Sequence, residues 1–226
     1  MQPTKIAVAA VAGMLTAGGA WADPVDQPPR DRVGIRTYDT TGIEPGIRLD
    51  AAAAAAAILA AAGIDSAWDA CGDVKTGAAV SRCAQPLQSD ELAVRFVRAG
   101  AVRGRTDPRT LGYAYVDTAS GTGALATVYA DRAAALARRA EVSLSTVLGR
   151  AVAHEVGHLL LGTNTHSTSG LMRTGWTPDA LQGASVEWLF APWDAAAIRH
   201  GLRGRVARGP LREPADASAA RLEAAR

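Results

Sequence analysis

Apolar and polar residues alternate in five short segments, the pattern of strands that bury one face. The predicted strands are residues 32–38, 64–70, 92–98, 111–117 and 124–130. An alanine-rich helix is predicted between the first two strands, over 47–62, and Gly63 follows it as a residue suited to end a helix. Because a helix joins these two strands, we expect them to be parallel and connected by a crossover.

The later part of the chain is predicted to be mostly helical. A polar, arginine-rich bridge at 131–141 leads to a long helix at 143–161, and a final helix is predicted over 184–201. The apolar face of the final helix is formed by Trp188, Leu189, Ile198 and Leu202. From Arg203 onward the chain is rich in Arg, Ala, Pro and Asp, which is typical of a loose tail.

The start of the chain has the features of an export signal. Lys5 precedes a short apolar run at 6–16, and Ala20-Trp21-Ala22 matches a cleavage site. The run is shorter than the about 20 residues that cross a bilayer, so we expect no stable membrane insertion. We therefore expect a secreted or periplasmic protein. The predicted organisation is a signal peptide at 1–22, a leader at 23–31, one domain at 32–202 and a flexible tail at 203–226.

The two cysteines agree with export. Cys71 and Cys83 lie twelve residues apart, across a segment that contains Gly72, Gly77 and Pro86. An even number of cysteines in an exported chain predicts a local disulfide that closes this loop.

The charge of the chain gives no reason to expect a nucleic-acid partner. The formal net charge is +2, and much of the basic excess lies in residues 199–226. No basic stripe is interleaved with aromatic residues. Arg132, Arg138 and Arg139 of the polar bridge are interpreted as a solvated face rather than as a recognition patch.

The candidate chemistry lies in the long helix, where residues 154–158 read His-Glu-Val-Gly-His. Residues four apart share a helix face with Cβ atoms about 6 Å apart. The imidazoles of His154 and His158 can therefore converge on one zinc ion, at about 2.0–2.1 Å from each nitrogen. Glu155 is next to that face, close enough to contact a metal-bound water and to act as a general base.

A third ligand is expected just beyond the helix. Gly162 can end the helix in the left-handed conformation, and a reversal over 163–165 would present His166 to the metal. Three protein ligands would leave the fourth position of a catalytic zinc for water. Asn164 and Glu187 remain competing candidates for the third position, the latter because it lies in the predicted final helix.

The stretch HEVGHLLLGTNTH, followed by STSGLM, resembles the metzincin clan of zinc metallopeptidases, which carry HExxHxxGxxH and a downstream methionine turn. The resemblance implies His154, His158 and His166 as zinc ligands, Glu155 as base, Gly162 as the turn glycine and Met172 as the turn methionine. The spacing departs from that pattern, because the glycine follows the second histidine by four residues and the third histidine follows it by eight. The stretch is also similar to one in uncharacterised exported bacterial proteins.

The resemblance further implies an α+β, zincin-like fold. We expect a five-stranded, mostly parallel mixed sheet with 111–117 as its antiparallel edge strand, a crossover helix, a long active-site helix and a C-terminal helix. The function expected on this basis is that of a monomeric, secreted zinc endopeptidase that binds peptide or protein substrates along the edge strand. Tyr113 and Tyr115 of this strand are interpreted as packing residues. The alternatives are a catalytically silent zinc-binding module and a zinc amidase that acts on cell-wall peptides.

Overall fold

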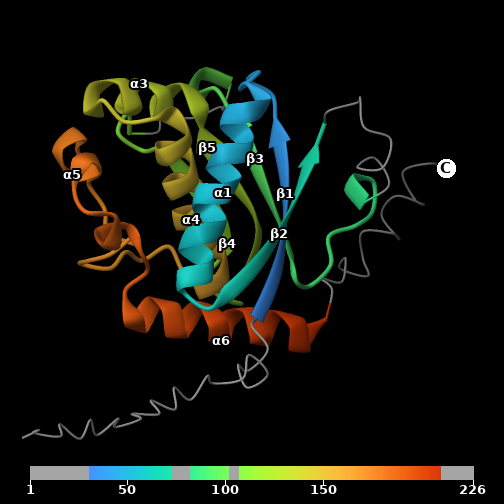
Figure 1. Cartoon of the computed structure of the whole chain (residues 1–226). Coiled ribbons are helices and arrows are strands. Elements are labelled where there is room, and N and C mark those ends of the chain that lie inside the picture. The colour runs from blue at the N-terminus through green and yellow to red at the C-terminus, as the bar shows by residue number, and fades with distance from the viewer. Residues whose placement is uncertain (1–30, 73–81, 102–106, 210–226) are drawn as a thin grey trace, which may run out of the picture.

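A five-stranded sheet forms the centre of the protein in the computed structural model, which describes residues 31–72, 82–101 and 107–209 (Figure 1). The strands are β1 (Asp31–Asp39), β2 (Ile64–Cys71), β3 (Glu91–Val97), β4 (Gly112–Asp117) and β5 (Thr122–Tyr129). Their order is β2-β1-β3-β5-β4. Neighbouring strands are parallel except β4, which is antiparallel to β5 at the edge, as expected. The predicted signal peptide, the leader up to residue 30 and residues 210–226 lie outside the described residues.

The crossover helix α1 (Pro45–Ala61) joins β1 to β2 and packs against α4 (Leu144–Leu161). The two helices approach closely because small residues meet there. A Cβ atom added to Gly149 would lie 2.6 Å from the Cβ of Ala54 and 2.8 Å from the carbonyl oxygen of Ala51. Gly63, with a φ of +82°, turns the chain from α1 into β2, as its position in the sequence predicts.

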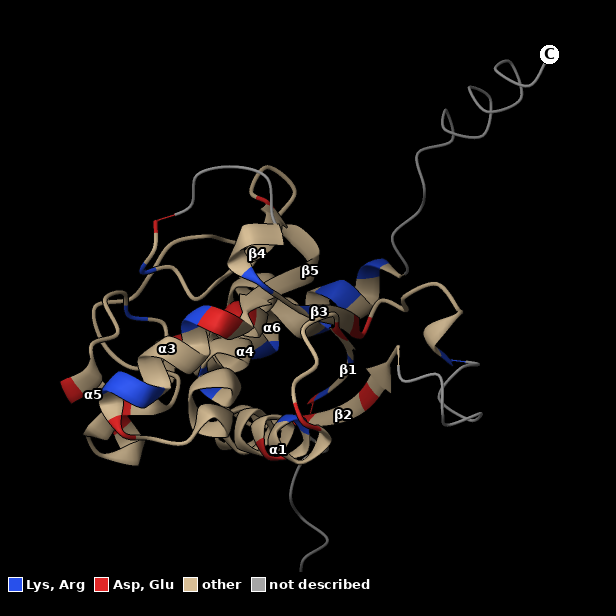
Figure 2. Cartoon of the chain, turned by 90° about the horizontal axis from the view of Figure 1, so that it is seen from above, with Lys and Arg blue, Asp and Glu red and all other residues tan. Residues whose placement is uncertain are grey.

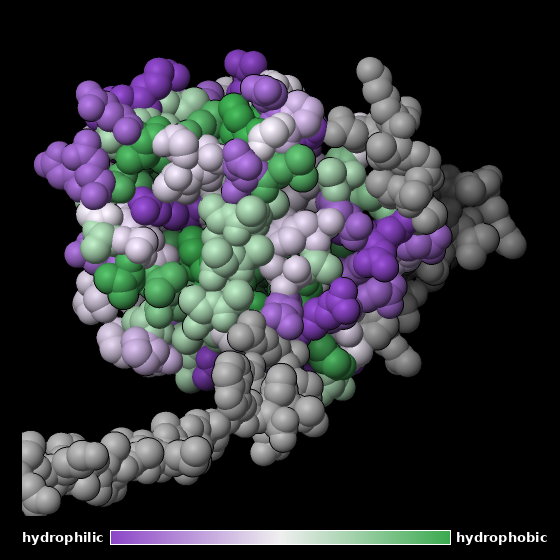
Figure 3. Space-filling model, in the orientation of Figure 1, coloured by the Kyte–Doolittle hydropathy of each residue, from purple (hydrophilic) through white to green (hydrophobic). Residues whose placement is uncertain are grey.

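The helices α1, α3 and α4 lie on one side of the sheet, as the view from above shows (Figure 2). The core between these layers is formed by fully buried residues of the strands and helices: Val33, Ile35, Leu92, Val94, Ala126, Val128, Val147, Leu148 and Val156. The alanine-rich outer surface of α1 gives the front of the molecule a moderately apolar strip (Figure 3). None of the helices that the structure describes is long and apolar enough to cross a membrane.

The predicted polar bridge at 131–141 is wrong, because these residues form the helix α3 (Ala130–Ala140). Its buried face consists of Ala133, Leu136, Ala137 and Ala140, which are spaced three and four residues apart. This buried face could not be recognised in the sequence, because most of its residues are alanines and alanine is abundant throughout the chain. Glu141 then ends the helix in the left-handed conformation, with a φ of 53°.

The predicted final helix over 184–201 is also wrong in its bounds. The chain instead forms the short helix α5 (Pro178–Gln182), a 3-10 turn η3 (Ser185–Trp188) and the helix α6 (Pro192–Arg208). Pro192 explains the break, since the residue before a proline prefers an extended backbone and proline itself suits the first helical position.

The helix α6 runs on to Arg208, so residues 203–208 are not part of a loose tail. Arg205 explains the extension, because its guanidinium is buried and donates to the carbonyl oxygens of Gly123, at 2.5 Å, and Ser89, at 3.3 Å. These hydrogen bonds hold the end of α6 against the rest of the protein, although the polar composition of the segment is typical of a loose tail.

The sulfur atoms of Cys71 and Cys83 lie at bonding distance, and their Cα atoms are 5.6 Å apart. The predicted disulfide is therefore present. It connects the end of β2 to the segment that leads into β3.

Candidate metal centre

The helix α4, which carries the HEVGH motif, is held firmly at both ends. Ser143 precedes it, and its hydroxyl accepts a hydrogen bond from the backbone N–H of Thr146, at 3.1 Å. Gly162 follows it in the left-handed conformation, with a φ of 66°. All residues from 151 to 160 are buried, so the motif lies on a rigid, packed element.

Three histidine side chains converge beside this helix. The Nε2 atom of His158 lies 3.1 Å from Nε2 of His154 and 3.3 Å from Nε2 of His166. Two nitrogens bound tetrahedrally to one zinc ion stand about 3.3 Å apart, given bonds of about 2.0–2.1 Å. The three side chains therefore have the separation of a zinc site.

Hydrogen bonds orient two of the rings. Nδ1 of His154 lies 2.9 Å from the carbonyl oxygen of Leu171, and Nδ1 of His158 lies 2.9 Å from that of Thr163. A carbonyl oxygen only accepts, so each Nδ1 carries the proton and each neutral ring turns a lone pair outward at Nε2. Two lone pairs that face each other at 3.1 Å repel unless a cation lies between them. The donor set thus fits a bound metal ion.

The environment keeps these rings in the neutral form that binds metals. Burial, and to a lesser extent the charge of His158, lowers the pKa of His154 to about 3. Burial lowers the pKa of His158 to about 4, and it also lowers that of His166. At neutral pH no proton would need to leave these nitrogens before a metal ion binds.

Met172 lies beneath the histidines. Its side chain is fully buried, and a Cβ atom added to Gly157 would be 2.7 Å from its sulfur and 2.7 Å from Cε1 of Phe190. Gly157 stands between the two helix histidines, so the sulfur packs directly under the turn of α4 that carries them. Met172 is therefore a buried packing residue under this turn.

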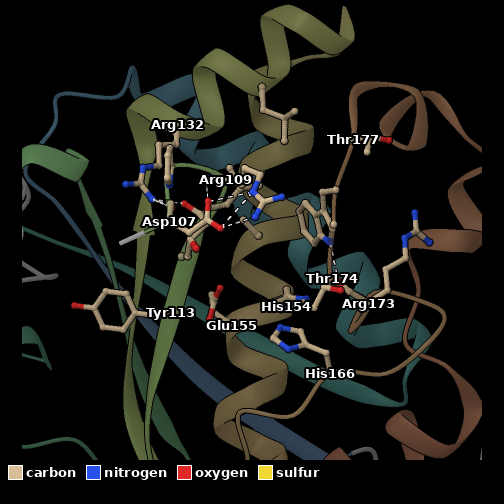
Figure 4. Close-up of a pocket in the computed structure, with 18 of the residues that line it drawn as sticks. Asp107, Arg109, Tyr113, Arg132, His154, Glu155, His166, Arg173, Thr174 and Thr177 are labelled. Carbon is tan, nitrogen blue, oxygen red and sulfur yellow. Dashed lines mark hydrogen bonds and ion pairs between the residues drawn. The ribbon is translucent and has the colours of Figure 1, made fainter. Parts of the chain in front are cut away.

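Glu155 points into the space beside the histidines (Figure 4). Its carboxylate packs against β4, where a Cβ atom added to Gly112 would lie 2.9 Å from Oε1. The side chain is 5% exposed, and its burial raises its pKa to about 8. A cation bound by the histidines would favour the ionised form and lower that pKa again.

The other two candidates for the third ligand, Asn164 and Glu187, are not part of the converging histidine group. Asn164 lines the cavity that contains the histidines, whereas the carboxylate of Glu187 is directed at Gly183, where an added Cβ would lie 3.0 Å from Oε2. Among the His, Cys, Asp and Glu residues that the structure describes, the one group of three that could hold a metal ion is His154, His158 and His166.

The tyrosines of β4 project to the sheet face away from Glu155. The hydroxyl of Tyr113 accepts a hydrogen bond from Arg95 at 2.9 Å, and its ring packs 6.1 Å from that of Tyr129. Tyr115 is 73% exposed. Tyr113 thus packs as interpreted, although it also borders the cavity that contains the histidines, whereas the interpretation of Tyr115 as a packing residue is wrong.

A cavity of about 770 Å³ opens above the histidines. Its walls are the loop 107–111 with β4, the helix α3 and the segment 173–177. Trp176 forms part of the last wall: its ring stands perpendicular to that of His154, with 5.5 Å between centroids, and its indole N–H donates to the carbonyl oxygen of Arg173 at 3.1 Å. Sequence reasoning missed Trp176, although it follows Met172 by only four residues.

No protein-family model matches the sequence, and no curated protein matches it either. Among solved structures, the chain is similar to a zinc-dependent peptidase from Methanocorpusculum labreanum (strain Z). The sequence identity is 13% and the TM-score is 0.45, over 73% of this chain and 100% of that chain.

Proposed function

We propose that the protein is an exported zinc endopeptidase. The observation that carries this proposal is the convergence of the His154, His158 and His166 Nε2 atoms beside the buried carboxylate of Glu155. These three nitrogens would hold the zinc ion. When bound there, zinc supplies Lewis acidity to a water molecule and to the carbonyl of the substrate.

Glu155 would take the proton from the attacking water and deliver it to the leaving amine. Its place supports both roles, because the carboxylate is buried next to the histidines and no described residue donates a hydrogen bond that would hold it in the ionised form. Its basicity would therefore depend on the bound metal.

The strand β4 would align the substrate. It pairs with β5 on one side, and its other side borders the cavity. An extended peptide can add to such a sheet edge through its main chain, which would lay a peptide bond across the histidines. Export is proposed from the predicted signal at 1–22, and the Cys71–Cys83 disulfide supports it.

The test compares wild type with Glu155→Gln. We expect the variant to retain one zinc ion per chain and to lose peptide hydrolysis by about 10²–10⁴-fold, the usual contribution of a general base. Glu187→Gln is the matched control, since it removes a carboxylate outside the site and should change neither property. An unchanged rate in Glu155→Gln would overturn the mechanism. Zinc-loaded wild type that cleaves no peptide in a broad library would favour the silent module, or an amidase if it cleaves cell-wall peptides.

A further inference from the structure

One face of α3 lines the cavity. The residues of α3 that border it are Arg132, Ala135, Leu136 and Arg139, spaced as positions i, i+3, i+4 and i+7 of a single helix face. Arg138 is exposed and does not border the cavity. The arginines that the sequence grouped as one solvated face therefore divide into two that line the cleft and one that does not.

The lining of the cavity is positively charged. Its charged residues are four arginines, Arg109, Arg132, Arg139 and Arg173, and two carboxylates, Asp107 and Glu155. Asp107 is neutralised locally, because Arg109 forms an ion pair with it at 2.8 Å. Within the described part of the chain, no carboxylate forms an ion pair with Arg139 or Arg173. A cationic cleft with apolar walls focuses its potential on whatever enters it.

The two arginines of α3 differ in what they contact. Arg132 donates to the carbonyl oxygens of Asp107 and Thr110, both at 2.7 Å, and so fastens the loop 107–111 to the helix. Arg139 stands two turns further on, about 10 Å along the helix axis. It is exposed, and its end of α3 adjoins α5, since Gln182 donates to the carbonyl oxygen of Ala140 at 3.0 Å.

The wall between these arginines is apolar. Ala135 and Leu136 of α3 face the cavity, together with Ala151, which lies one turn before His154 on α4. The cavity wall between Arg132 and Arg139 is therefore apolar, and Arg139 lies at one end of it. A substrate side chain with a few methylene groups and a terminal carboxylate, such as glutamate, is complementary to an apolar wall that ends at an arginine.

We propose that the cleft selects peptide substrates with a glutamate or aspartate within a few residues of the scissile bond, and that Arg139 determines this preference. A guanidinium binds a carboxylate through two parallel hydrogen bonds, so an arginine at the cavity such as Arg139 would favour a carboxylate by charge and by geometry. The inference depends on the proposed function, because it names the class of peptide that the zinc site would cleave.

The first experiment uses the zinc-loaded full chain and quenched peptides that differ at one position, which carries Glu, Gln or Lys. We expect kcat/KM at one or more positions to favour Glu over Lys by about tenfold, or about 1.4 kcal/mol. Arg139→Glu should abolish or reverse that preference. Arg138→Glu is the matched control, because it makes the same charge change one residue away, outside the cavity, and should keep the preference. Zinc content and circular dichroism establish that both variants fold.

A second experiment separates this inference from the proposed function. Binding of a fluorescent glutamate-rich peptide to zinc-loaded Glu155→Gln is followed by anisotropy, with and without Arg139→Glu. Binding that requires Arg139, without hydrolysis by wild type, would support the acidic preference and overturn the peptidase. Hydrolysis that is indifferent to Glu and Lys, or equally changed by Arg138→Glu and Arg139→Glu, would overturn the acidic preference and leave the peptidase standing. Failure of both hydrolysis and binding would overturn both.

Discussion

The hydroxyl of Ser167 lies 2.8 Å from one carboxylate oxygen of Asp194 and 2.9 Å from the other. Ser167 directly follows His166, and its backbone N–H donates to the carbonyl oxygen of Met172 at 3.0 Å. Asp194 belongs to the first turn of α6 and is 5% exposed, so little water competes for its oxygens. The helix α6 thereby fixes the loop that brings the third histidine to the other two.

We therefore predict that Asp194→Asn and Ser167→Ala weaken zinc binding. Ser167→Ala removes the donor of this anchor, and Asp194→Asn replaces two charged acceptor oxygens by one neutral oxygen, while the three histidines remain. The dissociation constant for zinc should therefore rise by up to about 10–100-fold, as is usual when a group that orients a metal ligand is changed. Competition with a chelator measures this change. Asp179→Asn, which alters an exposed acidic residue in the first turn of α5, should bind zinc like wild type. If both anchor variants bind zinc with wild-type affinity, Asp194 does not orient His166.

The identity of the third ligand predicts the metal content of four alanine variants. His158→Ala and His166→Ala should retain much less than one zinc ion per chain after dialysis, because two nitrogens hold zinc more weakly than three. Asn164→Ala and Glu187→Ala should retain one, since neither side chain belongs to the converging group. Elemental analysis of the dialysed variants measures the zinc content per chain. Zinc retained by His166→Ala and lost by Glu187→Ala would transfer the third position to the carboxylate.

Gly112→Ala is expected to disturb the base without removing the metal. The new Cβ would lie 2.6 Å from the carbonyl oxygen of Thr127 and 2.9 Å from Oε1 of Glu155, so either β4 or the carboxylate must move. We expect a loss of stability of about 1–3 kcal/mol, a kcat lowered about tenfold or more by the misplaced base, and an unchanged zinc content. Gly100→Ala is the control, because an added Cβ there meets nothing within 4 Å. Full activity in Gly112→Ala would contradict this prediction, because it would mean that β4 accommodates the methyl group without displacing the carboxylate of Glu155.

The zinc-free protein should be most stable near pH 6.5. On folding, the pKa of His154 falls from 6.5 to about 3 and that of His158 falls from 6.5 to about 4. Below pH 6.5 the unfolded chain therefore binds more protons than the folded chain, and the free energy of unfolding decreases as the pH is lowered. The pKa of Glu155 rises from 4.5 to about 8, so its contribution falls as pH rises from 4.5 to 8.

Summed over these three groups, stability should decrease by about 1.4 kcal/mol per pH unit on either side of the maximum, down to about pH 4.5 and up to about pH 8. Urea unfolding of chelator-treated protein at several pH values measures this profile. A stability that stays level between pH 6.5 and 8 would contradict the buried, protonated Glu155.

The sequence by itself determined the parts of this protein that depend on spacing within one element. Residues four apart on a helix must share a face, so the pairing of His154 with His158 could be predicted before any fold was known. The alternation of apolar residues likewise predicted all five strands, and the helix between the first two predicted their parallel arrangement.

Only the tertiary structure decided what depends on contacts between elements. Asp194 and Ser167 are 27 residues apart, and nothing local pairs a first-turn aspartate with a serine of a distant loop. The helical state of α3 likewise depends on packing, because its buried face is mostly alanine, which has no distinctive pattern in this chain. That packing also separates Arg139 from Arg138, since the direction in which a helix face points is set by what the helix packs against.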